Sequence, residues 1–394
     1  MKLIATVLTL IPFIALNQTI NFLGSTPNNG GCVYHLNNSY FLSGYWSAVD
    51  ILDYTNPGNI SNTGSYSAPG DCWFLKAFGN IAYFGGGTTQ SLTIADITNP
   101  STPVVQTTIM GLPWIPTGAA IKDNYLYLTF GNDSFYVLDQ TNLSNPIFLD
   151  TINISGIDSR EMVIIDTVLC IATQNGLKTF DISTPQSPTF LGSIGGGYIA
   201  ICADTLNKRV FVSKGGFGST AGFDAIDISN PTSPSVTFSG GSGFTAMGIG
   251  YYNNTVIQGG PNLVAAYTVS LSNATMTDSY ILNSQVVSVD VRDSIFFTCD
   301  MQNASVFNFG ATTNSLNTVS IDETKMFPIP AGEQLNIKTG LTIEKVLIYS
   351  LDGTIILKST GDQKIIDISS LSKGTYIIEI STENSIITEQ IVKI

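Results

Sequence analysis

Ionisable side chains are scarce in this chain of 394 residues. Only 11% of the residues are charged, there is one histidine, and 29 acidic residues outnumber 16 basic ones to give a formal net charge of −13. A nucleic-acid-binding protein needs a basic stripe to neutralise phosphates, and a protein that binds an anionic membrane surface needs a basic cluster. We therefore expect neither partner, and a surface made mostly of uncharged polar residues and glycine.

The single histidine, His35, limits the catalytic chemistry that motifs can support. A Ser–His–Asp or Cys–His arrangement, or any metal site containing histidine, would have to use this residue. The chain has no Cys-x-x-Cys, His-Glu-x-x-His, EF-hand or glycine-rich phosphate-loop spacing. We therefore expect no metal, no cofactor and no catalytic constellation, although a pair of aspartates would suffice for glycoside hydrolysis.

The chain also contains few cysteines, and their number is odd. The five cysteines are Cys32, Cys72, Cys170, Cys202 and Cys299. An odd number, scattered along the chain, argues against a disulfide framework. We expect buried small apolar side chains, and a single bridge between neighbouring strands, such as Cys170–Cys202, stays open.

A short phrase recurs along the chain at a nearly constant spacing. It consists of an aspartate, a Ser or Thr two residues later, and a turn containing proline; the leading aspartates of five copies lie 43, 43, 42 and 46 residues apart. Two weaker copies follow near residues 267 and 307. The five leading aspartates are Asp53, Asp96, Asp139, Asp181 and Asp227. A fixed period of this size indicates one supersecondary unit per repeat, stacked on its neighbours.

A polar turn followed by a β-rich run recurs in step with this phrase, as at residues 79–84, 123–128 and 166–171. Together the two signals predict four short antiparallel strands per repeat, which is the blade of a β-propeller. We therefore predict an all-β fold with a seven-bladed β-propeller. The recurring aspartates are expected to bond to backbone N–H groups in turns, although a ligand-binding role is the alternative. The repeats do not decide whether residues 21–25 help to close the ring.

The third strands of the repeats end in apolar residues and the recurring aspartate, as at residues 92–96 and 223–227. In this respect residues 30–310 resemble the LVIVD-repeat family of bacterial surface propellers, with the last two repeats degenerate. The resemblance implies the propeller fold and an extracellular setting. It implies no defined activity.

Residues 1–17 are expected to be a secretory signal peptide. Lys2 supplies the positive start, and residues 3–16 are almost wholly apolar but too few to span a bilayer. Ala15 and Asn17 fit the −3 and −1 positions of a cleavage site. We expect a propeller domain over residues 18–319 and no integral membrane segment after signal removal.

Composition changes near residues 312–325, in a stretch rich in Thr, Asn and Ser. Residues 1–319 contain one glutamate, Glu161, whereas residues 320–394 contain six glutamates and seven lysines. This shift predicts a second domain over residues 320–394. Its apolar pattern predicts a small β-sandwich, with strands at 334–337, 343–349, 354–358, 364–368, 374–380 and 386–394.

Several short runs in this second domain are distinctive: Pro-Ile-Pro at 328–330, Leu-Asn-Ile at 335–337, Leu-Asp-Gly at 351–353, Lys-Gly-Thr-Tyr at 373–376 and Ile-Val-Lys-Ile at 391–394. With them the segment resembles the type A C-terminal sorting domain of the type IX secretion system of Bacteroidetes, with Pro-Ile-Pro in place of the usual Pro-Asn-Pro. The resemblance implies passage through the periplasm to the outer cell surface or the medium, with the type IX machinery as partner. The sorting-signal candidates are Pro328, Pro330, Tyr349, Gly353, Gly374, Tyr376 and Lys393.

The irregular loops of the propeller are the expected binding face. In a propeller, the loops between blades and those between second and third strands lie on one face, opposite the regular turns. These loops carry rare residue types of the chain, and the candidate ligand-binding residues are Asp71, Trp73, Trp114, Asp158, Arg160, Glu161 and Tyr198. The structural alternative is that both tryptophans pack between blades and Arg160 pairs with a carboxylate.

We therefore expect a secreted or surface-held propeller that acts as a non-catalytic binding or adhesion module for a glycan or a surface protein. Two other functions fit the sequence: an extracellular hydrolase or lyase acting on polysaccharide or peptide in the propeller funnel, and a structural component of the cell surface or matrix. Carboxylates converging in the funnel favour the enzyme, whereas aliphatic residues and glycine favour binding or a structural role.

Overall fold

The computed structural model describes residues 19–27, 31–154, 159–214, 222–241, 247–300, 302–310, 325–328, 331–339, 342–350, 355–382 and 386–393. The predicted signal peptide, residues 1–17, lies outside this part of the chain. The described residues form β-strands, with one short 3₁₀ helix, η1 (Pro57–Asn59), so the all-β prediction is confirmed. Within them, no helix is long and apolar enough to cross a membrane. The chain divides into two compact units, Met1–Thr312 and Thr313–Ile394.

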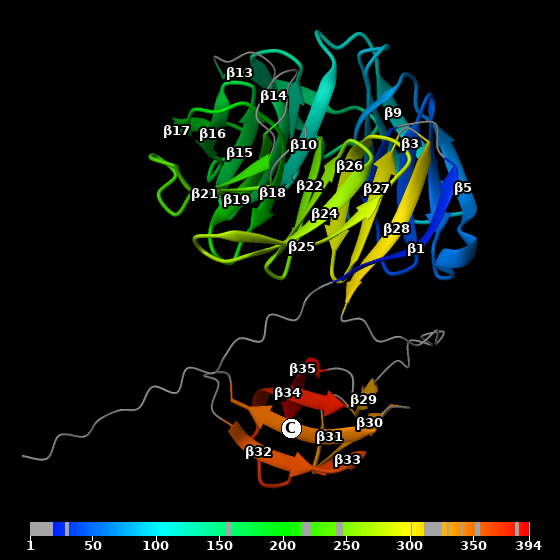
Figure 1. The fold of residues 1–394 in the computed structure, drawn as a ribbon, viewed down its shortest axis with the longest axis vertical. Coiled ribbons are helices and arrows are strands. Elements are labelled where there is room, and N and C mark those ends of the chain that lie inside the picture. The colour runs from blue at the N-terminus through cyan, green and yellow to red at the C-terminus, as the bar shows by residue number, and fades with distance from the viewer. Residues whose placement is uncertain are drawn as a thin grey trace, which may run out of the picture. The chain divides into compact units, whose positions relative to one another are not determined.

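In the first unit, the described strands form seven antiparallel sheets of four strands each (Figure 1). Sheets 1 to 3 are β2 (Cys32–His35), β3 (Tyr40–Tyr45), β4 (Ala48–Asp53) and β5 (Ser61–Ser67); β6 (Cys72–Phe78), β7 (Ile81–Gly86), β8 (Ser91–Asp96) and β9 (Val104–Ile109); and β10 (Pro116–Lys122), β11 (Tyr125–Phe130), β12 (Ser134–Asp139) and β13 (Ile147–Asn153). Sheets 4 to 6 are β14 (Ser159–Ile165), β15 (Val168–Thr173), β16 (Gly176–Asp181) and β17 (Thr189–Ile194); β18 (Tyr198–Asp204), β19 (Arg209–Lys214), β20 (Gly222–Asp227) and β21 (Ser235–Gly240); and β22 (Gly248–Tyr252), β23 (Thr255–Gly260), β24 (Leu263–Val269) and β25 (Ala274–Ile281). Sheet 7 contains β26 (Val286–Arg292), β27 (Ile295–Asp300), β28 (Asn303–Gly310) and β1 (Thr19–Pro27).

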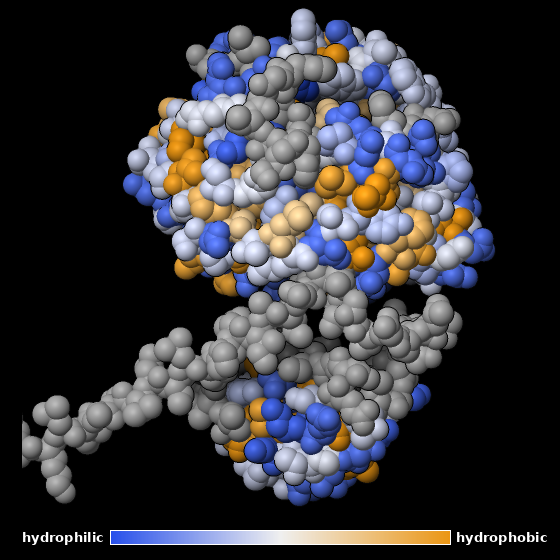
Figure 2. Space-filling model, viewed as in Figure 1, coloured by the Kyte–Doolittle hydropathy of each residue, from blue (hydrophilic) through white to orange (hydrophobic). Residues whose placement is uncertain are grey.

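The first strands of the sheets contact one another in order around a ring. β2 contacts β6, β6 contacts β10, and the series continues through β14, β18 and β22 to β26, which contacts β2 again. The sheets are therefore arranged as a closed β-propeller with their first strands at the centre. The fourth strands face solvent, and each of five carries an exposed large apolar residue: Val104, Ile147, Phe190, Val236 and Met276. Figure 2 shows that polar residues separate the apolar ones on the face in view.

Sheet 7 is built from both ends of the unit. β1 pairs antiparallel with β28, from Thr19 opposite Gly310 to Pro27 opposite Asn303, and Figure 1 shows the blue β1 alongside the yellow β28. The backbone N–H of Ile20 also donates to Asp278 Oδ2 at 2.6 Å, which ties β1 to sheet 6. The segment around residues 21–25 thus supplies the outer strand of the last sheet and joins the two ends of the ring.

The recurring aspartates fix turns. Each accepts at Oδ1 a 2.8 Å hydrogen bond from the backbone N–H two residues later; the donors are Thr55, Thr98, Thr141, Ser183 and Ser229. The residue directly after each aspartate donates its backbone N–H to the turn between the first and second strands, as Ile97 does to Asn80 O at 2.9 Å. The phrase therefore links the two regular turns of a sheet, which explains why it recurs once per repeat.

Two-residue turns join the first and second strands of several sheets, and they require a left-handed backbone. Gly79, Asp123, Asp166 and Asp293 have φ of 60°, 53°, 55° and 53°. Glycine adopts this conformation freely, and Asn and Asp tolerate it better than other residues. The second recurring signal of the sequence is therefore a consequence of hairpin geometry.

The second unit contains two sheets. One consists of β29 (Lys325–Phe327), β30 (Gln334–Lys338) and β33 (Ile365–Asp367); the other consists of β31 (Ile343–Tyr349), β32 (Ile355–Thr360), β34 (Gly374–Thr382) and β35 (Ile386–Lys393). Buried residues of both sheets, such as Leu335 and Ile348, belong to one core cluster. All six strands predicted from the sequence are present within two residues at either end, and β29 is an additional strand.

A buried ion pair in sheet 5 is hydrogen-bonded to the neighbouring sheet 6. Arg209 Nε lies 2.7 Å from Asp204 Oδ2, and the two side chains are 4% and 2% exposed. Arg209 also donates to the backbone oxygen of Ser270 in sheet 6. Burial alone would raise the pKa of Asp204, but hydrogen bonds from Asn207 and Arg209 lower it overall. Asp204 is therefore held as a carboxylate.

Asp204→Ala should destabilise the first unit by about 3–5 kcal/mol, because it leaves the Arg209 charge buried without a counter-charge. Since the pKa of Asp204 is lowered by folding, its contribution to stability is complete above about pH 5 and falls as the pH decreases towards the folded pKa. Denaturant unfolding from pH 3 to pH 7 measures both effects. Asp166→Asn is the control, because it removes the charge from an exposed pair with Lys208 at 2.8 Å, while asparagine tolerates the left-handed backbone at this position. It should change stability by less than about 1 kcal/mol. Equal losses in the two variants would contradict the prediction.

Candidate functional site

Two cavities lie along the centre of the propeller. The loop-side cavity has a volume of about 120 Å³ and is lined by residues near the start of the first strands, including Cys32, Trp73 and Arg160. The turn-side cavity has a volume of about 430 Å³ and is lined by residues nearer the strand ends, including Phe78 and Tyr251. The residues common to both linings are Tyr34, Lys76, Glu161, Ile249, Val289 and Asp290. This common layer therefore marks where the two cavities meet.

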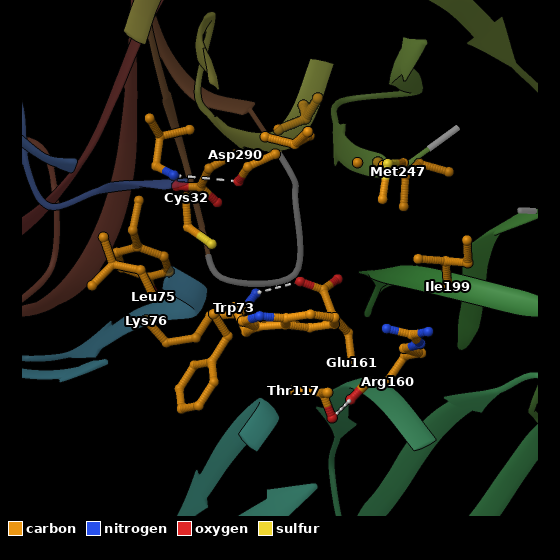
Figure 3. Close-up of a pocket in the computed structure, with 18 residues that line it drawn as sticks. Cys32, Trp73, Leu75, Lys76, Thr117, Arg160, Glu161, Ile199, Met247 and Asp290 are labelled. Carbon is orange, nitrogen blue, oxygen red and sulfur yellow. Dashed lines mark hydrogen bonds and ion pairs between the residues drawn. The ribbon is translucent and has the colours of Figure 1, made fainter. Parts of the chain in front are cut away.

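The common layer holds one cation between two carboxylates. Lys76 Nζ lies 3.7 Å from Glu161 Oε1, and Figure 3 shows the two side chains directed towards each other. Glu161 Oε2 accepts the backbone N–H of Ile201 at 3.2 Å, and Asp290 Oδ2 accepts that of His35 at 2.6 Å. Burial alone would lower the pKa of Lys76, but the carboxylates of Glu161 and Asp290 raise it overall. Lys76 is therefore a cation at neutral pH, and the layer has a small negative charge.

Trp73 forms an exposed aromatic platform at the loop-side cavity. The residue is 42% exposed, and its Nε1–H donates to Asp71 Oδ2 at 2.8 Å. Asp71 Oδ1 accepts the backbone N–H of Thr88 at 2.5 Å. The ring lies against Gly87, where a Cβ atom would come within 2.2 Å of it. The Arg160 guanidinium carbon lies 5.8 Å from the Trp73 ring centroid. These contacts fix the orientation of the indole while leaving part of it open to solvent.

The charge on Asp71 is maintained by the same contacts. Burial would raise the pKa of Asp71, but hydrogen bonds from Thr88 and Trp73 lower it overall. The carboxylate therefore remains ionised near neutral pH while it orients the Trp73 ring.

The structure brings some of the predicted site residues together and separates others. Trp73, Arg160 and Glu161 line the loop-side cavity, and Asp71 orients Trp73. Trp114 is 47% exposed but is not among the described lining residues of either cavity. Neither tryptophan is buried between sheets, so the alternative that both tryptophans pack between blades is wrong. Asp158 lies outside the described residues.

Tyr198 is placed differently from the rest of the predicted set. Its side chain is only 1% exposed, and its hydroxyl donates to Asp224 Oδ2 at 3.0 Å within sheet 5. The neighbouring Ile199 lines the loop-side cavity instead. A shift of one residue along a strand moves a side chain to the opposite face, which explains the difference.

Lys76 and Asp290 are site residues that the sequence reasoning missed. Each is a charged residue inside an otherwise largely apolar first strand, Cys72–Phe78 and Val286–Arg292. First strands line the centre of a propeller, so a charged residue in such a strand could have been predicted to lie in the central channel. Met247 and Ile199 also line the loop-side cavity, and Figure 3 shows them across from Trp73.

His35 has a structural environment. It is 4% exposed, its Nε2 lies 2.9 Å from the Tyr54 hydroxyl, and that hydroxyl donates to Asn37 O at 2.8 Å. Nε2 therefore carries the hydrogen, and burial lowers the pKa of His35, so the ring is neutral. Among the described residues, no group of three or more His, Cys, Asp or Glu could hold a metal ion.

The five cysteines are free thiols, and the bridge between Cys170 and Cys202 that the sequence left open is not formed. Cys170 and Cys299 are fully buried, as expected for small apolar side chains. Cys32 lines the loop-side cavity.

The sorting-signal candidates are spread through the second unit. Tyr349 donates to Glu379 Oε2 at 3.1 Å, and Tyr376 donates to Ser372 O at 2.8 Å. Gly374 is paired with Lys393 across β34 and β35. Pro328 directly follows β29 and is exposed, while Pro330 and Gly353 lie outside the described residues.

Solved structures that resemble the chain include a β-propeller domain. The WD40 β-propeller domain of Doa1 has a TM-score of 0.60 and 10% identity, covering 76% of this chain and 98% of that chain. A chain of the mitotic checkpoint complex has a TM-score of 0.59 and 12% identity, covering 78% of this chain and 97% of that chain. At such identities these likenesses establish the fold alone.

Sequence comparisons identify both parts of the chain. Beta-agarase D of Zobellia galactanivorans is 36% identical over 88 residues, which covers 20% of this chain and 18% of that protein. A family model described as the LVIVD repeat matches residues 69–110, 118–153, 158–195 and 218–240. A model described as a secretion system C-terminal sorting domain matches residues 325–394. The chain is therefore an LVIVD-repeat propeller protein with a type IX secretion system sorting domain, exported to the cell surface or secreted.

Proposed function

We propose that the propeller is a non-catalytic binding module that holds a glycan at the loop-side cavity. The observation that carries this proposal is Trp73, a residue that is 42% exposed although Asp71 and Gly87 fix the orientation of its ring. A fixed aromatic ring offers an apolar contact area at little entropic cost, because it is already ordered before binding. Arg160 beside the ring supplies hydrogen-bond donors for ligand hydroxyls.

The size of the loop-side cavity favours a ligand that lies across its mouth. Its volume of about 120 Å³ is below the ~300–1,000 Å³ of pockets that enclose a small molecule. A chain-like ligand, such as an oligosaccharide, could contact Trp73 and Arg160 while only one group enters the cavity. The few charges in the chain agree with a neutral ligand.

The carboxylates of the common layer have structural partners. Glu161 accepts a backbone hydrogen bond and pairs with Lys76, and Asp290 accepts a backbone hydrogen bond from His35. These contacts link first strands of different sheets, so they favour a role in fixing the channel. They are the reason for preferring a binding module to an enzyme.

An extracellular hydrolase is the second candidate. Glu161 and Asp290 line the same two cavities, and paired carboxylates are the usual apparatus for glycoside hydrolysis. The similarity to beta-agarase D points to the same substrate class but covers only 20% of this chain.

Binding of residues 18–394 to a glycan array should identify at least one ligand. Trp73→Ala should weaken that binding by roughly 30-fold or more, because it removes the central contact of the site. Trp114→Ala is the matched control, since Trp114 is equally exposed but does not line the described cavities; it should change the affinity by less than about threefold. No glycan bound, or equal affinity of Trp73→Ala and the wild type, would contradict the proposal. Polysaccharide cleavage that is lost in Glu161→Gln or Asp290→Asn would favour the hydrolase instead.

A further inference from the structure

Two cysteines of neighbouring sheets meet at the loop-side cavity. Cys32 is the first residue of β2 and Cys72 is the first residue of β6, and these two strands contact each other in the ring. The cysteines are 40 residues apart in sequence, which is close to one repeat period. They therefore occupy equivalent positions in sheets 1 and 2.

The Cys32 side chain contacts Cys72. Cys32 Sγ lies 3.7 Å from the backbone oxygen of Cys72, and Cys72 Sγ lies 3.6 Å from the backbone oxygen of Phe74. Gly44, the cross-strand partner of Cys32, provides the space for this approach, because a Cβ atom on Gly44 would lie 2.7 Å from Cys72 Sγ. The sulfur atoms of a disulfide are about 2.05 Å apart, so a bond requires the two side chains to turn towards each other across this contact.

We propose that Cys32 and Cys72 form a disulfide that links sheets 1 and 2 at the loop-side cavity after the protein leaves the cytoplasm. Disulfides form and persist in the periplasm and at the cell surface but are rare in the cytosol. The sorting domain at residues 325–394 indicates export of the chain to the cell surface or the medium. This proposal is independent of whether the cavity binds a glycan.

The two thiols differ in access, which sets the order of the chemistry. Cys32 lines the loop-side cavity, where an oxidant can reach it. Burial, followed by the contact with Cys32, raises the pKa of the Cys72 thiol well above its usual range. Cys72 is therefore a poor first nucleophile, since the thiolate is the attacking form.

The oxidant is a second disulfide, either in a periplasmic thiol oxidase or in glutathione disulfide. The Cys32 thiolate attacks it, forms a mixed disulfide and releases one thiolate of the oxidant. Cys72, after losing its proton, attacks Cys32 Sγ and releases the second thiolate. The two oxidant thiolates take up the two protons that Cys32 and Cys72 lose, and two electrons pass from the protein to the oxidant.

Peptide mapping of residues 18–394 tests the proposal directly. The reduced protein is equilibrated with glutathione disulfide, the remaining thiols are alkylated under denaturing conditions, and the digest is analysed without reduction. We expect a cross-linked peptide pair containing Cys32 and Cys72, with Cys170, Cys202 and Cys299 alkylated. Alkylation of both Cys32 and Cys72, or a cross-link from Cys32 to Cys299, would overturn the proposal.

Thermal unfolding gives a second readout. The oxidised protein should unfold at a temperature higher by roughly 5–10 °C than the reduced protein, because the bridge restricts the unfolded chain. Dithiothreitol should remove this difference. Cys72→Ala should unfold at the same temperature with and without dithiothreitol. Cys202→Ala, which alters a first-strand cysteine outside the pair, should keep the difference between the oxidised and reduced protein. A difference that persists in Cys72→Ala would refute the assignment.

Discussion

Deleting residues 19–27 should abolish the cooperatively folded propeller. The deletion removes β1, which pairs with β28 along its whole length, and it removes Ile20 from the cluster that contains Phe307 and Phe309. Net hydrogen bonding contributes about 0.5–1.5 kcal/mol per bond, and each buried large apolar side chain contributes about 1.5–3 kcal/mol. The combined loss is comparable with the whole stability of a typical domain, roughly 5–15 kcal/mol.

Circular dichroism during heating and limited proteolysis measure this effect. We expect no sharp unfolding transition and rapid digestion of the truncated chain. Asn21→Ala is the matched control within the same strand, because the Asn21 side chain makes one exposed hydrogen bond, to Asn308 Oδ1 at 3.0 Å. It should lower stability by less than about 1 kcal/mol. A truncated protein with the wild-type unfolding temperature would show that the ring does not depend on β1.

Deleting residues 320–394 should stop surface display and trap the protein in the periplasm. These residues contain the matched sorting domain, and the strands of the propeller all lie within residues 19–310. The propeller should therefore fold without its export signal. Protease accessibility on intact cells, together with fractionation of a strain that has the type IX system, measures the outcome.

Point variants test whether surface display requires the folded second unit. Ile348→Asp places a carboxylate in the core of the second unit, where Ile348 is fully buried, and should abolish display as the deletion does. Lys358→Ala, at an exposed position of β32, should leave display unchanged. Normal display of the deletion variant would refute the sorting role. Periplasmic protein whose propeller is also unfolded would contradict the independence of the two units.

The local structure of the propeller follows from its sequence because each repeat carries its own turn chemistry. Asp96 and its equivalents accept backbone hydrogen bonds wherever the phrase occurs, and Gly79 and Asp123 supply the left-handed turns. Such contacts join residues that are close in the chain, so a spacing in the sequence predicts them. β1 carries neither signal, and its role in closure depends on a partner near residue 300.

The site was harder to predict, because residues from distant repeats form it. Lys76, Glu161 and Asp290 belong to sheets 2, 4 and 7, and only the closed ring brings them to one channel. Trp73, Arg160 and Glu161 were identified because they are rare residue types. Their expected place in irregular loops was wrong, since they lie near the start of the first strands β6 and β14. Tyr198 was misplaced because the loop could not fix which residues of β18 face the channel. The Cys32–Cys72 contact was readable in principle, since the two cysteines are separated by about one repeat.

The pairing of β1 with β28 determines when the propeller can reach its final form. Asn21 and Asn308, whose side chains are hydrogen-bonded between these two strands, lie 287 residues apart in the chain. A growing polypeptide presents β1 first and β28 last, so the early repeats wait for the late ones before the ring can close. Contacts between such distant segments also slow folding, because a long loop must be ordered before they form. The ring of this chain therefore cannot close before β28 has been synthesised, so the two ends of the propeller remain apart until the late repeats are made.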